Sequence, residues 1–286
     1  MDFLEALADP AIPFLRYAFG AGILASLSFG IIGTYVVARR ITYIAGAIAH
    51  CVLGGIGAGL YCQHKLGITW FGPLSGAIVA ALLAAIIIGL VSLHANQRED
   101  TAIGALWAIG MAIGLLFIAK TPGYIEPMSY LFGNILLISK FDLWMVLMLD
   151  ALVVIIATLF YHKFLAVCFD EEYARLRGVR TDLYYLLLLC LTALTVVLLV
   201  RVVGIVMVIA LLTLPAAVAS NFAKGLWQMM VLATLFCIGF IGSGLAVSYN
   251  YDLPSGPTII VIAGLVYLGA TGWRQFRKNS RLRSAV

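Results

Sequence analysis

The chain has 286 residues, of which 63% are apolar and only 11% are charged, whereas about a quarter of the residues in soluble globular proteins are charged. Together with a mean hydropathy of +1.07, this composition excludes a soluble protein and leaves little length for a folded domain outside a membrane. The net charge of +5 indicates orientation in a membrane rather than binding of nucleic acid.

Near-continuous apolar runs predict nine membrane-spanning helices, because a helix needs about 20 residues to cross a bilayer. The runs are 14–37, 43–62, 71–93, 101–119, 141–162, 183–200, 202–220, 226–248 and 257–272. The two runs that meet at Arg201 could instead form one broken element, so eight spans is the alternative. The predicted fold is all-α, a polytopic transmembrane bundle of eight or nine spans with a single domain over 1–286.

The basic residues predict the orientation, since loops on the cytoplasmic side are rich in lysine and arginine. If the N-terminus is outside, the inner segments hold 13 of the 18 basic residues and the outer ones hold the other five, which are Arg16, Lys65, Lys120, Lys140 and Arg201. We therefore expect the N-terminus outside and the C-terminus in the cytoplasm. The basic tail from Arg274 then acts as the last topological anchor.

Small residues and cysteines in the spans indicate packing rather than chemistry. The run from Gly54 to Gly59 favours close contact between helices and lacks the spacing of a nucleotide-binding loop. No GxxxxGK[ST] motif occurs, so we expect any ATP hydrolysis to come from a partner protein. The five cysteines form no CxxC pair, and we expect them to be small core residues.

Two ionisable residues inside spans are candidate site residues, because charge at bilayer depth costs at least about 2.5 kcal/mol. His50 is a candidate metal ligand of a transport path, and the alternative is a histidine hydrogen-bonded across a helix interface. Asp150 is a weaker candidate, for which helix pairing is the alternative to a transport role. Cys62 and His64 offer two soft ligands at the end of the second span, and two ligands do not make a site.

The connector from Asp170 to Gly178 predicts a short cytoplasmic helix. Asp170 suits the N-cap, Glu171 and Glu172 suit the first turn, Arg175 and Arg177 the last turn, and Gly178 the left-handed position after the helix. Phe169, Tyr173 and Leu176 form one apolar stripe. A helix this short is marginal in water, so we expect it to pack on its own bundle or on a cytoplasmic partner.

Taken together, six stretches resemble the permease subunit of bacterial ABC importers for zinc, manganese or iron, over nearly the whole chain. They are Arg39 to Tyr43 with Ala49 and His50, Glu99 to Gly104, Tyr130 to Leu136, Phe169 to Ala174 with Gly178 and Val179, Val203 to Ala217, and Asp252 to Pro257. Each stretch is weak alone, and their order makes the resemblance specific.

The resemblance implies a bacterial inner-membrane importer permease, a homodimer or related heterodimer, with two cytoplasmic ATPase subunits and an external metal-binding protein. The helix after Asp170 would couple the permease to the ATPase, and no cofactor would be bound apart from the transported cation. Members of the family usually carry an aspartate four residues before the histidine of the second span, so that both lie on one face. Here that position is Gly46, and the loss of a hard oxygen ligand favours zinc over manganese.

The predicted function is therefore the membrane path of an ABC-type importer for divalent metal cations, driven by a separate ATPase. The alternative is an ion- or proton-coupled secondary transporter or channel in which His50 and Asp150 relay ions. An intramembrane enzyme is excluded, because the spans contain no HExxH motif, paired acids or serine–histidine pair.

Overall fold

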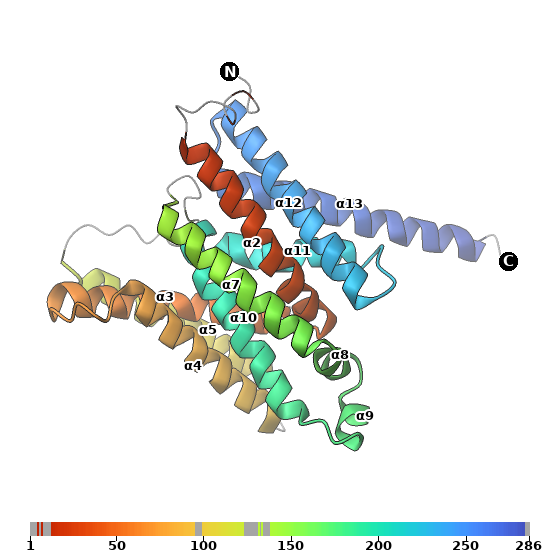
Figure 1. Cartoon of the computed structure of the whole chain (residues 1–286), viewed down its shortest axis with the longest axis horizontal. Coiled ribbons are helices and arrows are strands. Elements are labelled where there is room, and N and C mark those ends of the chain that lie inside the picture. The colour runs from red at the N-terminus through yellow and green to blue at the C-terminus, as the bar shows by residue number, and fades with distance from the viewer. Residues whose placement is uncertain are drawn as a thin grey trace.

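The structure, a computed structural model, describes residues 5, 7, 13–94, 99–122, 131, 133 and 138–283, which include no strand. Apolar segments fold as helices in a bilayer because every backbone polar group must find its partner within the segment. The helices are α2 (Pro13–Ala38), α3 (Thr42–Lys65), α4 (Pro73–His94), α5 (Glu99–Lys120), α7 (Lys140–Leu159), α8 (Tyr161–Phe169), α9 (Glu171–Leu176), α10 (Thr181–Val203), α11 (Ile205–Ala219), α12 (Leu226–Tyr251) and α13 (Ser255–Arg283) (Figure 1). The predicted all-α membrane bundle is confirmed.

Within the described residues, eight helices are long and apolar enough to cross a membrane, and α11 is not among them. With 15 residues, α11 is about 22 Å long, which is less than the hydrocarbon thickness of about 30 Å. Gly204 separates α10 from α11 with φ of 85° and ψ of 162°, a conformation that is essentially restricted to glycine. The runs that meet at Arg201 are therefore two helices, and the predicted span over 202–220 is a short one.

Although α11 is short, it runs from one end of the bundle to the other. Just before its start, Arg201 of α10 pairs with Asp142 in the first turn of α7, with 2.9 Å between Nε and Oδ1. Near its end, Val37 of α2 packs against a cluster that contains Ala219. We call these two ends of the bundle the Arg201 end and the α9 end, since α9 lies beside the end of α2.

The chain enters and leaves the bundle at opposite ends. α2 stops at the α9 end, so it starts at the Arg201 end. In α13, Arg274 donates a hydrogen bond of 2.9 Å to Asn221, just after α11, which places this part of α13 at the α9 end. Opposite ends require an odd number of passages, and among the described helices the short α11 adds one passage to the eight full-length helices. Which end faces outside remains a prediction from the charges.

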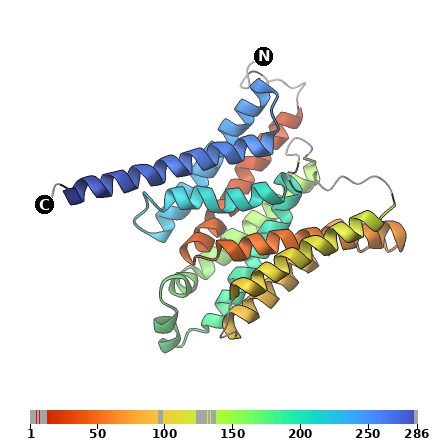
Figure 2. The ribbon, with the colours of Figure 1, turned by 180° about the vertical axis from the view of Figure 1, so that it is seen from behind.

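Figures 1 and 2 show α3, α4 and α5 grouped on one side of the molecule and α11, α12 and α13 on the other, with α2, α7 and α10 between them. The glycine-rich run of α3 allows the first group to pack closely. A Cβ at Gly54 or Gly57 would lie 2.9 or 2.5 Å from the carbonyl oxygens of Gly110 or Gly114 on α5, and one at Gly55 would overlap with the backbone of α4. The predicted packing role of this run is therefore confirmed on two faces of α3.

Candidate metal path and coupling segment

His50 lies on α3 with its ring stacked on the indole of Trp107 from α5. The ring centroids are 4.3 Å apart and the planes differ by 17°. Nδ1 of His50 is buried and has no hydrogen-bond partner among the described residues. A histidine coordinates a metal through a nitrogen at the ring edge, whereas the stack with Trp107 covers a face of the ring. The predicted alternative of a hydrogen-bonded histidine is not seen at Nδ1.

Gly46 lies one turn before His50 and faces the same indole. A Cβ at this position would lie 3.7 Å from Cζ3 of Trp107, which is an ordinary van der Waals contact. The four-residue spacing thus places both positions on one face of α3, as predicted. A Cβ fits at Gly46, but a carboxylate extending beyond it would compete with the indole for space.

Asp150 on α7 lies in a different helix contact. Its carboxylate accepts a hydrogen bond from Ser28 of α2, and the residue is only 3% exposed. His50 faces α5, so the structure does not bring the two candidates together. Cys62 and His64 gain no third ligand, since no group of three or more His, Cys, Asp or Glu side chains able to hold a metal ion occurs in the described part of the chain.

The predicted cytoplasmic helix is α9 (Glu171–Leu176), which is capped at both ends by residues next to it in the chain. The carboxylate of Asp170 accepts a hydrogen bond of 2.9 Å from the backbone N–H of Tyr173, as an N-cap does. At the other end, Gly178 has φ of 77°, and the N–H groups of Gly178 and Val179 bond back to helix carbonyls as a Schellman motif. The helix has six residues, so the predicted short helix between the caps Asp170 and Gly178 is present.

The predicted apolar stripe at this helix is exposed. Phe169, which ends α8, is 67% exposed, Tyr173 is 55% exposed and Leu176 is 87% exposed, whereas Ala174 is buried. Packing of the stripe on its own bundle was one of two expectations, and it is wrong for these three side chains. Their exposure favours the other expectation, which is packing on a cytoplasmic partner.

Charged side chains tie α9 to the neighbouring elements. Glu171 pairs with Arg39 from the turn between α2 and α3 and, at 3.3 Å, with Arg175. Arg175 in turn pairs with Asp182 of α10 at 2.6 Å, and the guanidinium of Arg39 lies 5.4 Å from the ring centroid of Tyr185. A displacement of α9 therefore acts directly on the start of α3 and on α10.

A polar cavity of about 420 Å³ lies beside this charge network at the α9 end. Its wall includes Arg39 and Glu171 together with Tyr43 of α3 and Asp100 and Ile103 of α5. The cavity thus reaches the helix pair that carries His50 and Trp107.

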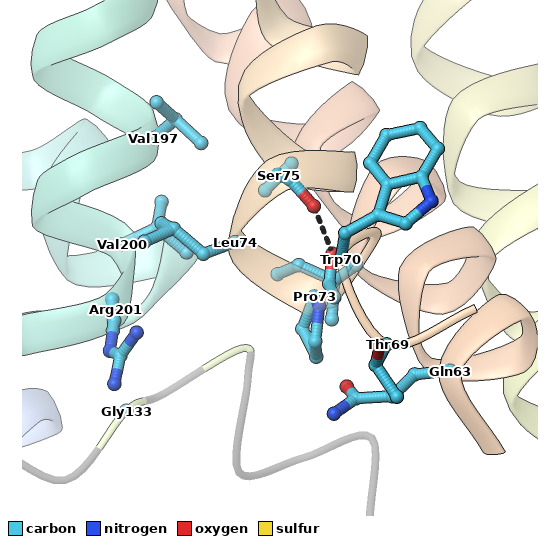
Figure 3. Close-up of a pocket in the computed structure, with 13 residues that line it drawn as sticks. Gln63, Thr69, Trp70, Pro73, Leu74, Ser75, Gly133, Val197, Val200 and Arg201 are labelled. Carbon is cyan, nitrogen blue, oxygen red and sulfur yellow. Dashed lines mark hydrogen bonds between the residues drawn. The ribbon is translucent and has the colours of Figure 1, made fainter. Parts of the chain in front are cut away.

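A larger cavity of about 790 Å³ lies at the Arg201 end. Figure 3 shows Arg201 on one side of it and Gln63 and Thr69 on the other, and Ser75 donates a hydrogen bond of 2.9 Å to the carbonyl of Gly72. The ion pair with Asp142 offsets the charge of Arg201, which would otherwise repel a cation.

Trp107 and the Arg201–Asp142 pair are absent from the sequence-based prediction. Asp142 carries a recognisable signal, because it forms a capping box with Ser139 at the start of α7. The stack of Trp107 on His50 joins two helices that are far apart in sequence, and no local spacing encodes it. The stretch from Tyr130 to Leu136, which carries part of the resemblance, lies largely outside the described residues.

The chain is similar to known membrane transport proteins. Residues 11–273 match the ABC 3 transport family. A probable metal transport system membrane protein of Chlamydia pneumoniae is 42% identical over 92% of this chain and 91% of its own length. The manganese import system permease protein ScaB of Streptococcus gordonii is 30% identical over 93% of both. The structure of PsaBC from Streptococcus pneumoniae in complex with Fab matches with a TM-score of 0.82 and 29% identity over 94% of both chains.

Proposed function

The chain belongs to the ABC 3 transport family, and we propose that it is the membrane-spanning permease subunit of an importer for divalent metal cations. The observation that carries the metal cargo is His50, a ligand-type side chain at bilayer depth whose Nδ1 lacks a hydrogen-bond partner among the described residues. Buried polar groups are nearly always paired, so a group of this kind points to a ligand that is bound in passing. The relatives named for metal or manganese transport support the same cargo.

The expected partners follow from the missing ATP-binding loop and from the exposed apolar side chains of α9. The sequence has no ATP-binding loop, so the energy must come from separate ATPase subunits, and the exposed Tyr173 and Leu176 of α9 offer them a docking surface. An external metal-binding protein would deliver the cation to the cavity at the Arg201 end. A second permease subunit, identical or related, would complete the path.

The cargo is zinc, manganese or iron. Relatives at about 30% identity are named for manganese, whereas Gly46 leaves His50 without a carboxylate on the same face. Nitrogen-rich sites favour zinc and oxygen-rich sites favour manganese. Uptake of the three metals in competition therefore decides how far the substitution at Gly46 has changed the preference.

His50→Ala tests the metal path in cells that express the permease with its ATPase and binding protein. Uptake of radiolabelled metal should fall while the amount of assembled complex stays the same. His94→Ala is a matched control, since His94 lies at the exposed end of α4. Equal uptake by wild type and H50A at equal expression would show that His50 only packs.

The alternative of a secondary transporter or channel predicts uptake that persists without the ATPase. In the structure Asp150 and His50 lie in different helix contacts, so they form no direct relay. Deleting the ATPase should therefore abolish metal uptake. A protonophore should stop uptake no faster than depletion of ATP does. Uptake that survives the deletion would favour the secondary transporter.

We place the α9 end in the cytoplasm, because most of the basic residues lie there. In a cysteine-free background, an impermeant thiol reagent added outside should label a cysteine at Glu5 but not one at Lys224, which is exposed between α11 and α12. The reverse pattern of labelling would invert the orientation and exchange the roles of the two cavities.

A further inference from the structure

We infer that Trp107 and Tyr43 form a gate that closes the path between His50 and the polar cavity at the α9 end. The inference rests on the proposed function and deepens it, since it assigns the residues that separate the proposed ligand from the inside of the cell. Neither residue was a candidate from the sequence.

The indole of Trp107 covers one face of α3 over two turns. It stacks on His50 with 4.3 Å between ring centroids, and its Cζ3 lies 3.7 Å from the Cβ position of Gly46. At the other side it meets the ring of Tyr43 with a centroid distance of 5.9 Å and an angle of 43°. Because residues 43, 46 and 50 follow a helical spacing, all three contacts fall on the same face.

The polar cavity begins where these aromatic rings end. Among the described residues its wall includes Tyr43 but neither Trp107 nor His50. The carboxylates of Asp100 and Glu171 in the same wall suit the passage of a cation once it has left His50. Along α3, the indole of Trp107 and the phenol of Tyr43 therefore lie between the His50 ring and the cavity.

Position 46 borders the space that the indole occupies. The six-membered ring lies 3.7 Å from the Cβ position of Gly46, which leaves room for a Cβ but not for a longer side chain that extends toward the indole. A carboxylate at position 46 would project into the space that the indole fills. The glycine at 46 and the tryptophan at 107 thus form a complementary pair, in which an aromatic cover stands where the family usually has a second ligand.

The contacts suit a gate that opens in each transport cycle. Trp107 is only half-buried, and it meets His50 and Tyr43 through ring contacts, with no hydrogen bond between them. Arg39, three residues before the start of α3, pairs with Glu171 of α9. A movement of α9 by the ATPase therefore reaches the helix that carries Tyr43, Gly46 and His50.

The test uses the complete transporter, with ATPase and binding protein, in liposomes that hold a zinc- or manganese-sensitive dye. Trp107→Leu removes the aromatic ring, Trp107→Phe keeps one, and Trp144→Leu is a control on α7, where Trp144 is 67% exposed. Losing an aromatic stack should raise the open fraction, and with it the ATP-independent leak of metal, about two- to tenfold. W107F should leak less than W107L, and W144L should match wild type.

An assembled W107L complex that leaks no more than wild type overturns the gate, as does a W144L complex that leaks as much as W107L. If W107L does not assemble, Tyr43→Leu must raise the leak instead, and an unchanged leak in that variant overturns the gate equally. Failure of the proposed function looks different, because the wild-type complex would then transport neither metal with ATP and binding protein present.

Discussion

The two candidate sites of this protein are built from opposite kinds of contact. At α9, hydrogen bonds and ion pairs satisfy the polar groups at both helix ends, and the apolar side chains of Tyr173 and Leu176 are left exposed. At His50, the contacts are ring stacking and apolar packing, and the polar Nδ1 is left without a hydrogen-bond partner among the described residues. Under the proposed function, each partner would supply what its site leaves unsatisfied, which is apolar surface for α9 and a cation for His50.

The difference also predicts how each region responds to change. The cap contacts of α9 are local in sequence, whereas the Arg39–Glu171 pair joins α9 to the turn before α3. Damage to α9 that spares this pair should therefore stay confined to α9 and whatever docks on it. The His50 site depends on the distance between α3 and α5, which is set by glycine contacts one and two turns further along, at Gly54 and Gly57. Substitutions at these glycines should therefore alter the His50 site by changing the distance between the two helices, although they make no contact with His50.

The largest effect is expected when both exposed residues of α9 are made polar. If docking buries Tyr173 and Leu176, each contributes roughly 1.5–3 kcal/mol. Tyr173→Ser with Leu176→Ser should therefore release the ATPase, or leave it bound but no longer stimulated by loaded binding protein. Copurification and stimulated ATP turnover measure the two outcomes.

Phe222→Ser is the control for this pair, because Phe222 is 59% exposed at the same end of the bundle but outside α9. It should leave copurification and turnover unchanged. Normal assembly and normal stimulation of the α9 double variant would move the coupling role to another connector of the α9 end.

Gly57→Ala should test how far the His50 site depends on packing. The new Cβ would lie 2.5 Å from the carbonyl oxygen of Gly114, and overpacking of this kind typically costs about 1–3 kcal/mol. The midpoint of thermal unfolding in detergent should fall, and uptake should fall with it. Gly239→Ala on α12 is the control, since no atom lies within 4 Å of its Cβ position, and its midpoint should stay or rise.

Gly46→Asp should change the preference of the His50 site by a smaller amount. An oxygen ligand on the same face favours manganese over zinc, and we expect the ratio of manganese to zinc uptake to rise about tenfold, or about 1.4 kcal/mol. Because the indole competes for the space, the shift should be larger in the double variant with Trp107→Leu. Identical ratios in wild type and both variants would separate position 46 from the metal path.

Local patterns in the sequence predict the local structure well. Of the nine spans that the apolar runs predict, eight are full-length helices in the structure, because length and composition alone decide them. The cap at Asp170 and the left-handed Gly178 follow from residue types that these positions require. The close packing of Gly54 follows from its missing side chain. In these cases the physical cause lies within a few residues of the effect.

The sequence does not predict contacts between segments that are far apart in the chain. Hydropathy alone does not reveal that the run over 202–220 is a short helix, since the break depends on the backbone at Gly204. The stack of Trp107 on His50 requires the crossing of α3 and α5, and the pairing of Asp150 with Ser28 requires that of α2 and α7. The spacing of His50 and Gly46 shows that they share a face, but not which helix that face meets.

The smallest effect is expected at the cap of α9. Asp170→Ala removes the acceptor for the N–H of Tyr173 and should cost about 1 kcal/mol of helix stability, whereas asparagine caps about as well as aspartate. Asp170→Ala should therefore speed amide hydrogen exchange over residues 171–176 and weaken ATPase docking modestly, while Asp170→Asn keeps both near wild type. Metal selectivity should stay the same in both variants, because the cap bonds to Tyr173 within α9 and the Arg39–Glu171 pair that ties α9 to the turn before α3 is left in place. A changed selectivity in D170A would contradict the separation of the two regions and show that α9 also sets the distance between α3 and α5.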